Sequence, residues 1–120
     1  MDIEHLLKIV NDALEDKKAK DIQVLDVRDM SNITDFMVVA TGRSPRQVNA
    51  LARHVYEQSK ANGHQPFGEE GDTLGEWVLV DLGDVIVHVM QPQTREFYQL
   101  EKLWSKMGGD IRLKELRGAE

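Results

Sequence analysis

The segment WVLVDLGDVIVHVM, from Trp77 to Met90, decides the fold of this chain. Its two apolar runs are short and rich in β-branched residues, which predicts two strands, Trp77–Val80 and Val85–Met90. The connection DLGD between them has a glycine in its third position, where a hairpin turn often needs a left-handed residue. We therefore predict a β-hairpin that belongs to a larger sheet.

A second unit lies upstream, where a strand leads into a helix. The run Phe36–Thr41 is apolar without alternation, which predicts a strand buried on both faces. Ser44 and Gln47 have the spacing of a capping box, and Pro45 suits the first helical position. We therefore predict a helix that begins there and ends at Asn62-Gly63.

Further elements flank these two units. Apolar residues at helical spacing predict a first helix that the charged stretch Glu15–Lys20 ends, and a strand follows over Asp21–Val27. Residues 64–75 are rich in glycine and acid, so we predict a loop there, with a short strand near Gln65–Phe67. Pro92 opens a last helix. Its predicted buried side consists of Phe97, Leu100, Leu103 and Trp104.

The order of these elements favours one β-sheet covered by helices, an α/β (α+β) class. The chain has 120 residues, which fits a single domain. We place this domain at residues 1–106 and a polar, charged tail at residues 107–120. The hydrophobic fraction of 41% and the charged fraction of 30% are ordinary for a soluble globular protein.

Composition also narrows the compartment and the class of partner. The chain has no cysteine, which excludes disulfides and thiolate metal sites and suits the reducing cytoplasm. No apolar run approaches the roughly 20 residues that span a bilayer, and Asp2 and Glu4 stand where a secretory signal would be positive. The net charge of −6 opposes binding to nucleic-acid phosphates, so we expect a basic protein as the partner.

Two features invite a catalytic interpretation, and each has a simpler alternative. Asp81 and Asp84 could hold magnesium, but they flank the predicted turn, which favours carboxylates that bond nearby backbone amides. The turn Gly42-Arg43-Ser44 could bind phosphate through its amides, yet it lacks the glycine spacing of phosphate-binding loops. We therefore expect no enzyme activity and no cofactor.

The same hairpin could serve recognition instead. The histidines of the chain lack the spacing of metal ligands, so we predict no metal site. His88 alternates with Val87 and Val89 and therefore points to the opposite face of the sheet. Trp77 shares alternate spacing with Asp81, and an aromatic residue beside acids is typical of interfaces. Trp77 fits a place in the core equally well, so both interpretations stay open.

Longer motifs resemble one known family. The string EWVLVDLGDVIVHVM and the downstream REFYQLEKLWS resemble the ribosomal silencing factors, also called Iojap-like proteins. KDIQVLDV (Lys20–Val27), ITDFMVVATGRSPRQV (Ile33–Val48) and GEEG (Gly68–Gly71) agree with that family in the same order. The resemblance covers about Leu6 to Ser105. It implies a nucleotidyltransferase-like α/β fold with a mixed sheet, without transferase activity.

The resemblance also implies a partner and a mechanism. Members of the family bind the fourteenth protein of the large ribosomal subunit, on the face that meets the small subunit. They thereby block subunit joining and repress translation when nutrients are short. Members often form homodimers when free. The residues that the resemblance places in or near the partner-facing surface are Trp77, Asp81, Asp84, His88, Tyr98, Glu70 and Glu76.

Two alternatives stand beside the silencing role. An assembly factor for the large ribosomal subunit, the role of the organellar relatives, would use the same binding surface at a different time. A metal-dependent nucleotidyltransferase would use Asp81 and Asp84 near the turn Gly42–Ser44. This second alternative is less favoured, because the two acids flank a turn and no third acid is aligned with them.

Overall fold

This computed structural model describes residues 2–29, 32, 34–71 and 74–99, and these residues form five strands and three helices. In chain order the elements are α1 (Ile3–Asp16), β1 (Lys20–Asp26), β2 (Phe36–Thr41), α2 (Pro45–Ala61), β3 (Gly68–Gly71), β4 (Trp77–Asp81), β5 (Val85–Met90) and α3 (Pro92–Tyr98). The strands form one sheet in the order β1-β2-β5-β4-β3. Strands β2 and β5 are parallel and the other neighbours antiparallel. The predicted α/β class with a mixed sheet is confirmed.

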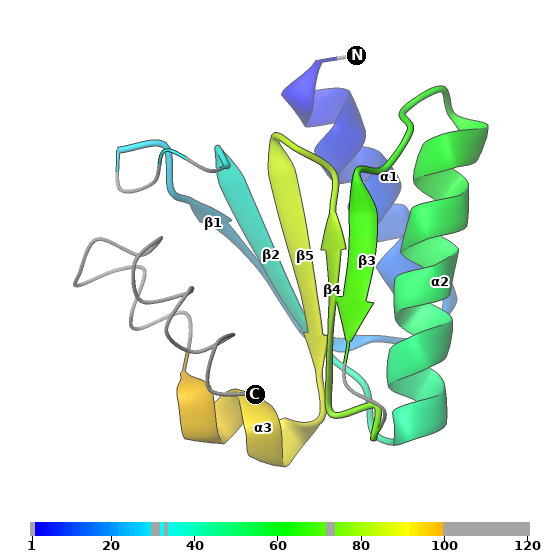
Figure 1. Ribbon diagram of the computed structural model, residues 1–120, viewed down its shortest axis with the longest axis vertical. Helices are drawn as coiled ribbons and strands as arrows, with labels where there is room; N and C mark the ends of the chain where they lie inside the picture. Colours follow the sequence, from blue (N-terminus) through cyan, green and yellow to red (C-terminus); the bar gives the residue numbers. More distant parts are fainter. Residues whose placement is uncertain (1, 30–31, 33, 72–73, 100–120) are drawn as a thin grey trace.

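The two faces of the sheet carry different layers. Helices α1 and α2 lie together on one face, and α3 lies on the other (Figure 1). Alternation along β4 and β5 sends Val78, Val80 and Val87 to the helical pair, where they join the larger core. The residues between them, such as Trp77 and Met90, point to the other face and form a smaller cluster. Both faces of the central strands are therefore buried, as predicted for β2.

The start of α2 shows why this segment is helical. The Ser44 side chain accepts a hydrogen bond from the Gln47 N–H over 3.1 Å, as the capping prediction requires. The Gln47 Oε1 accepts from the Arg43 N–H over 2.7 Å, one residue earlier than in the usual capping box. The side-chain Nε2 of Gln47 donates to the Lys17 carbonyl over 3.1 Å, so this hydrogen bond links the end of α1 to the start of α2.

Two predictions about individual segments were wrong. The short strand lies at Gly68–Gly71 and not at Gln65–Phe67. Its sequence GEEG has low strand propensity, and pairing with β4 determines its place. Phe97, predicted to be buried, is 79% exposed, because the next residue, Tyr98, turns toward the sheet. The other members of that predicted stripe, Leu100, Leu103 and Trp104, lie outside the described residues.

The predicted boundary between a domain at 1–106 and a tail at 107–120 also falls outside the described residues and stays a prediction. The nucleotidyltransferase-like description of the fold also stays a prediction. Within the described ranges, no helix combines the length and the apolar character needed to cross a membrane.

Candidate functional site

The hairpin between β4 and β5 has the turn that its sequence predicts. Gly83 has φ +85°, in the left-handed region that glycine adopts without strain. The Asp81 carboxylate accepts a hydrogen bond from the Gly83 N–H over 2.9 Å. The Leu82 N–H donates to the Val85 carbonyl over 2.9 Å and closes the turn. The interpretation of Asp81 as a turn residue is therefore confirmed.

The second aspartate of the turn, Asp84, directly precedes β5 and lies beside the start of β2, the parallel neighbour of β5. The Asp84 carbonyl accepts from the N–H groups of Asp35 and Phe36, over 3.1 and 3.0 Å. The turn at Gly42 follows the other end of β2, so these two sites are separated by the whole strand, roughly 20 Å. A metal ion held by the aspartates could not contact a phosphate bound at that turn, because metal–oxygen contacts are about 2 Å long. The geometry argues against the nucleotidyltransferase alternative.

Trp77 and His88 lie inside the protein. Trp77 is 1% exposed and His88 is 0% exposed. The indole N–H of Trp77 donates to the His88 Nδ1 over 2.9 Å. Since the indole nitrogen can only donate, Nδ1 carries no proton and the neutral imidazole holds its proton on Nε2. The question of Trp77 as core or surface is settled in favour of the core.

The ring of Tyr98 packs against this buried pair. Its ring centroid lies 4.8 Å from that of Trp77, at an interplanar angle of 49°. The rings of Trp77 and His88 are 5.7 Å apart and tilted by 51°. We call Trp77, His88 and Tyr98 the aromatic cluster. Both Trp77 and His88 are buried in this conformation, and their place in or near the partner-facing surface stays a prediction. Tyr98 is half-buried.

The predicted acidic residues have a different location. Glu70 pairs with Leu79 across β3 and β4, so its side chain shares a sheet face with Trp77 and Asp81. Glu70 and Asp84 are exposed, and Asp81 is half-buried. Glu76 is exposed but precedes β4, at the end of the strand away from the turn.

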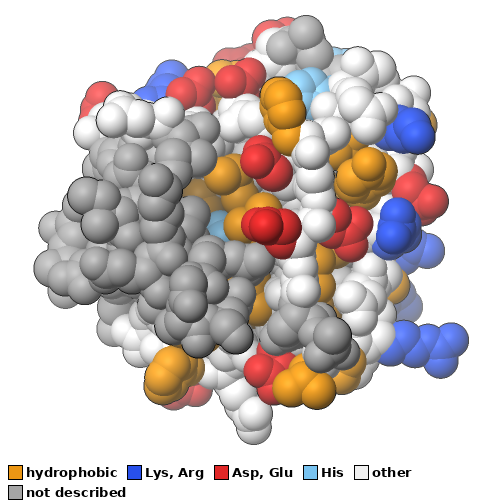
Figure 2. Space-filling model, viewed as in Figure 1, with side chains coloured by type: hydrophobic (Ala, Val, Ile, Leu, Met, Phe, Trp, Pro, Cys, Tyr) orange, Lys and Arg blue, Asp and Glu red, His pale blue; other side chains and the backbone are white. Residues whose placement is uncertain are grey.

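One residue beside these acids was not identified from the sequence. Phe67 is 77% exposed, and its backbone N–H donates to the Asp81 carbonyl over 2.8 Å. Its ring lies over Gly83, where an added Cβ atom would come within 2.5 Å of the ring. We call Phe67, Glu70, Asp81 and Asp84 the acidic hairpin surface. Figure 2 shows carboxylates and hydrophobic side chains close together where β3 and β4 lie in Figure 1.

The sequence held a signal for Phe67, since it is a large apolar residue directly before the acidic stretch GEEG. The prediction of a short strand near Gln65–Phe67 drew attention away from that signal. An exposed aromatic ring next to a turn that carries two aspartates suits a binding surface, because aromatic residues are enriched at protein interfaces.

The remaining histidines show no metal-binding arrangement. The His64 Nε2 lies 2.8 Å from the Leu82 carbonyl oxygen, and the His54 Nε2 lies 3.3 Å from the Asp16 carboxylate. Among the described residues, no three side chains of histidine, aspartate or glutamate gather in a group that could hold a metal ion. These contacts are those of structural histidines.

Comparisons with known proteins agree with the resemblance in the motifs. The profile of the family described as "Ribosomal silencing factor during starvation" matches residues 1–120. The ribosomal silencing factor of Haemophilus influenzae is 47% identical over 100 residues, covering 83% of this chain and 98% of that protein. A crystal structure of a Chromobacterium violaceum protein has a TM-score of 0.85 and 45% identity, covering 92% of this chain and 97% of that chain.

Organellar proteins are related as well. A mouse protein named "Mitochondrial assembly of ribosomal large subunit protein 1" is 33% identical over 106 residues, which cover 86% of this chain and 46% of that protein. Maize chloroplast Iojap is 37% identical over 95 residues, which cover 77% of this chain and 40% of that protein. The bacterial relatives carry the name of a regulatory factor and not of an enzyme. With its profile matched from end to end and bacterial relatives similar over almost their whole length, the chain belongs to the ribosomal silencing factor, or Iojap-like, family.

Proposed function

We propose that this protein binds the fourteenth protein of the large ribosomal subunit and sterically blocks the joining of the two subunits, which represses translation when nutrients are short. It makes and breaks no bond, and the inhibition is occlusion of the surface that the small subunit needs. The observation that carries the proposal, beyond membership of the family, is the acidic hairpin surface with the exposed ring of Phe67.

Charge supports a basic protein as the partner. The chain carries a net charge of −6, and the acidic hairpin surface adds local carboxylates around an apolar anchor. Opposite charges on the partner would speed the encounter and fix the orientation of the complex. The Phe67 ring would then lose its contact with water and supply a large share of the affinity.

The aromatic cluster has a supporting role in this proposal. Trp77 lies on the same face of β4 as Asp81, four residues away at the end of the strand opposite to the turn. Its hydrogen bond to His88 joins β4 to β5, and its contact with Tyr98 joins the sheet to α3. These contacts join the strands that present Glu70 and Asp81, so Trp77 and His88 would support the binding surface through the sheet.

Sedimentation of ribosomes tests the proposal. Added protein is expected to shift joined ribosomes toward free subunits and to migrate with the large subunit. A Phe67→Ala variant should lose both effects while keeping its fold. If the wild-type protein leaves the balance of subunits unchanged, or migrates with the small subunit, the proposal fails.

A second function is favoured by one specific observation, the name of the mouse relative, which describes assembly of the mitochondrial large subunit. An assembly factor would use the same surface on the same ribosomal protein, but on immature particles. Depletion of the protein followed by analysis of large-subunit precursors distinguishes the two. Accumulated precursors would indicate assembly, and normal subunits with unrestrained joining would indicate silencing.

A further inference from the structure

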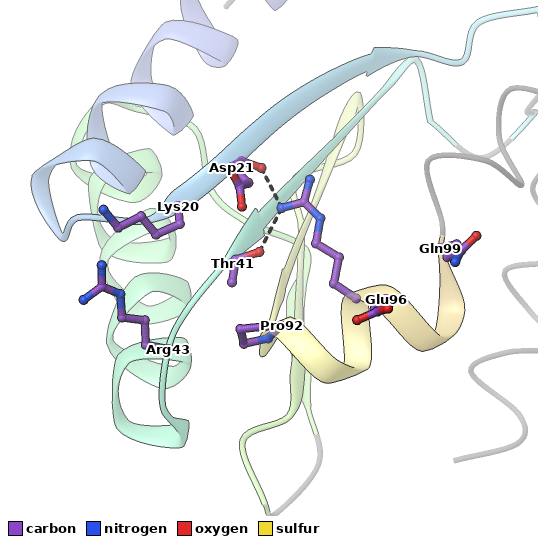
Figure 3. A pocket seen from close by; sticks show the side chains of 8 residues that line it. Lys20, Asp21, Thr41, Arg43, Pro92, Glu96 and Gln99 are labelled. Atoms are coloured by element: carbon purple, nitrogen blue, oxygen red, sulfur yellow. Dashed lines mark hydrogen bonds between the residues drawn. The ribbon is translucent and has the colours of Figure 1, made fainter.

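A pocket of about 370 Å³ opens at the end of the sheet opposite to the acidic hairpin surface. Side chains from the start of β1, the end of β2, the turn after it and α3 line this pocket (Figure 3). Its volume falls in the range of roughly 300–1,000 Å³ that small-molecule sites occupy.

The position of the pocket in the topology is that of a ligand site. Strands β2 and β5 are adjacent and parallel, and both end at this edge of the sheet. The helix that follows β2 packs on one face, whereas the helix that follows β5 lies on the other (Figure 1). In open α/β sheets, ligands bind in the crevice outside the carboxyl ends of the strands where the connections diverge in this way.

The pocket has a small excess of positive charge although the chain is acidic. Lys20, Arg43 and Arg95 line it together with the carboxylates of Asp21 and Glu96. Lys20 and Arg43 make no ion pair with any residue in the described part of the chain. Figure 3 shows their charged ends on the same side, away from Glu96. Two cations that converge without a carboxylate between them repel each other, and an anion would relieve that repulsion.

Arg95 is held in position at the wall of the pocket. Its Nη1 donates to the Asp21 carbonyl over 2.6 Å and to the Thr41 hydroxyl over 2.9 Å, as the dashed lines in Figure 3 mark. Asp21 has φ +50°, a conformation rare outside glycine, at the point where the register of β1 against β2 shifts. The bulge turns the Asp21 carbonyl toward the guanidinium, so the charge is fixed before any ligand arrives.

The backbone of the turn after β2 does not supply this site. The Gly42 N–H donates to the Met90 carbonyl over 2.9 Å, and the Arg43 N–H is engaged by Gln47. The amide-based phosphate interpretation of this turn therefore loses two of its donors. The long side chains of Lys20 and Arg43 remain as the groups that could reach an anion.

We propose that this pocket binds a small phosphorylated ligand, whose phosphate groups contact the side chains of Lys20 and Arg43, while Arg95 forms the wall of the pocket. Guanidinium groups are well suited to phosphate because they donate two parallel hydrogen bonds to its oxygens. This inference goes beyond the proposed function, since it concerns the other end of the sheet and no ribosomal component.

Isothermal titration of the full chain at low ionic strength tests the proposal, with inorganic pyrophosphate and a nucleoside diphosphate as separate probes. We expect saturable binding of pyrophosphate at one site. Arg43→Gln should weaken it at least tenfold, and Arg46→Gln, which removes an exposed arginine outside the pocket, should leave it unchanged. Glu96→Gln should tighten it, because that change removes a repelling carboxylate from the wall.

Saturable binding of pyrophosphate supports the site if Arg43→Gln weakens it and Arg46→Gln does not. This holds whether or not the nucleoside diphosphate also binds. Absence of saturable pyrophosphate binding overturns it. So does equal weakening by Arg46→Gln, which would indicate attraction to any surface cation. In the ribosome sedimentation assay, Arg43→Gln should shift joined ribosomes toward free subunits as the wild type does. Failure of the pocket proposal is therefore distinguishable from failure of the silencing proposal.

Discussion

The two ends of the sheet differ in charge and in how their side chains are used. At the hairpin end, Phe67 and the carboxylates of Glu70 and Asp84 face solvent. At the other end, cations surround a pocket and one of them, Arg95, is fixed by hydrogen bonds. An exposed aromatic residue near carboxylates suits a protein partner, whereas a pocket lined by cations suits a small anion. One small sheet thus carries two separable candidate sites.

A second comparison concerns aromatic residues within the hairpin region. Trp77 is buried and hydrogen-bonded to His88 at one end of β4, whereas Phe67 is exposed beside the other end. If a substitution of Trp77 abolished ribosome binding, the cause would therefore be a destabilised fold and not the loss of a direct contact. Phe67 is the residue whose removal reports on the surface alone.

The largest effect is expected from Trp77→Ala. Removing a buried tryptophan leaves a large cavity and deprives His88 of its donor, so the free energy of unfolding should fall by about 3–5 kcal/mol. Urea denaturation measures this loss. Phe97→Ala is the matched control, because Phe97 is exposed on α3, and it should change stability by less than about 0.5 kcal/mol. Equal losses in the two variants would contradict the distinction between buried and exposed aromatics.

Phe67→Ala should separate binding from stability. We expect its affinity for the purified fourteenth large-subunit protein to fall by about 2 kcal/mol, roughly 30-fold, if the ring is the anchor of the interface. Surface plasmon resonance measures the affinity, and urea denaturation should show a change within about 0.5 kcal/mol. An unchanged affinity would remove Phe67 from the interface.

The carboxylates of the turn should act on the rate of association. In the double variant Asp81→Asn, Asp84→Asn, the amide oxygen at position 81 can still accept the Gly83 hydrogen bond, so the turn should persist. The association rate constant should fall about tenfold and lose much of its dependence on salt. Stopped-flow mixing at two ionic strengths measures both. The exposed acids Glu4 and Glu57, changed together to Gln, should leave the rate near that of the wild type.

The smallest effect is expected at β1, on the far edge of the sheet. Hydrogen bonds from Arg28 hold the pKa of Asp26 below its ordinary value. A depressed pKa means that the interaction stabilises the fold above the ordinary carboxyl pKa, near 3.9, and is lost as the pH falls through the lower folded value. The wild type should thus exceed Asp26→Asn slightly in unfolding midpoint at pH 6, and the difference should shrink as the pH falls below the ordinary carboxyl pKa. Because the ion pair between Arg28 and Asp26 is exposed to solvent, high salt should also reduce the difference.

Much of the fold followed from local patterns in the sequence. The capping residues of α2, the uninterrupted apolar run of β2 and the glycine of the hairpin each specify a local structure through their own chemistry. The alternation of His88 with the valines correctly predicted its sheet face, since the period of a strand is fixed. These features depend on neighbours within a few residues.

What could not be predicted depends on contacts between distant segments. The strand GEEG has little propensity of its own and forms because β4 offers an edge. Burial of Trp77 needs Tyr98, and no local pattern reveals that pairing. The pocket likewise joins Lys20 to Arg95, brought together only by the sheet order. The acids of the candidate site were found from their motif, whereas the exposure of Phe67 required the structure.

Hydrogen–deuterium exchange on the complex with the purified fourteenth large-subunit protein tests the central claim most directly. The claim is that the acidic hairpin surface, and not the pocket, contacts this partner. We predict slowed exchange on complex formation in residues 67–84 and unchanged exchange in residues 41–46. Protection of the pocket end with none at the hairpin would contradict the account.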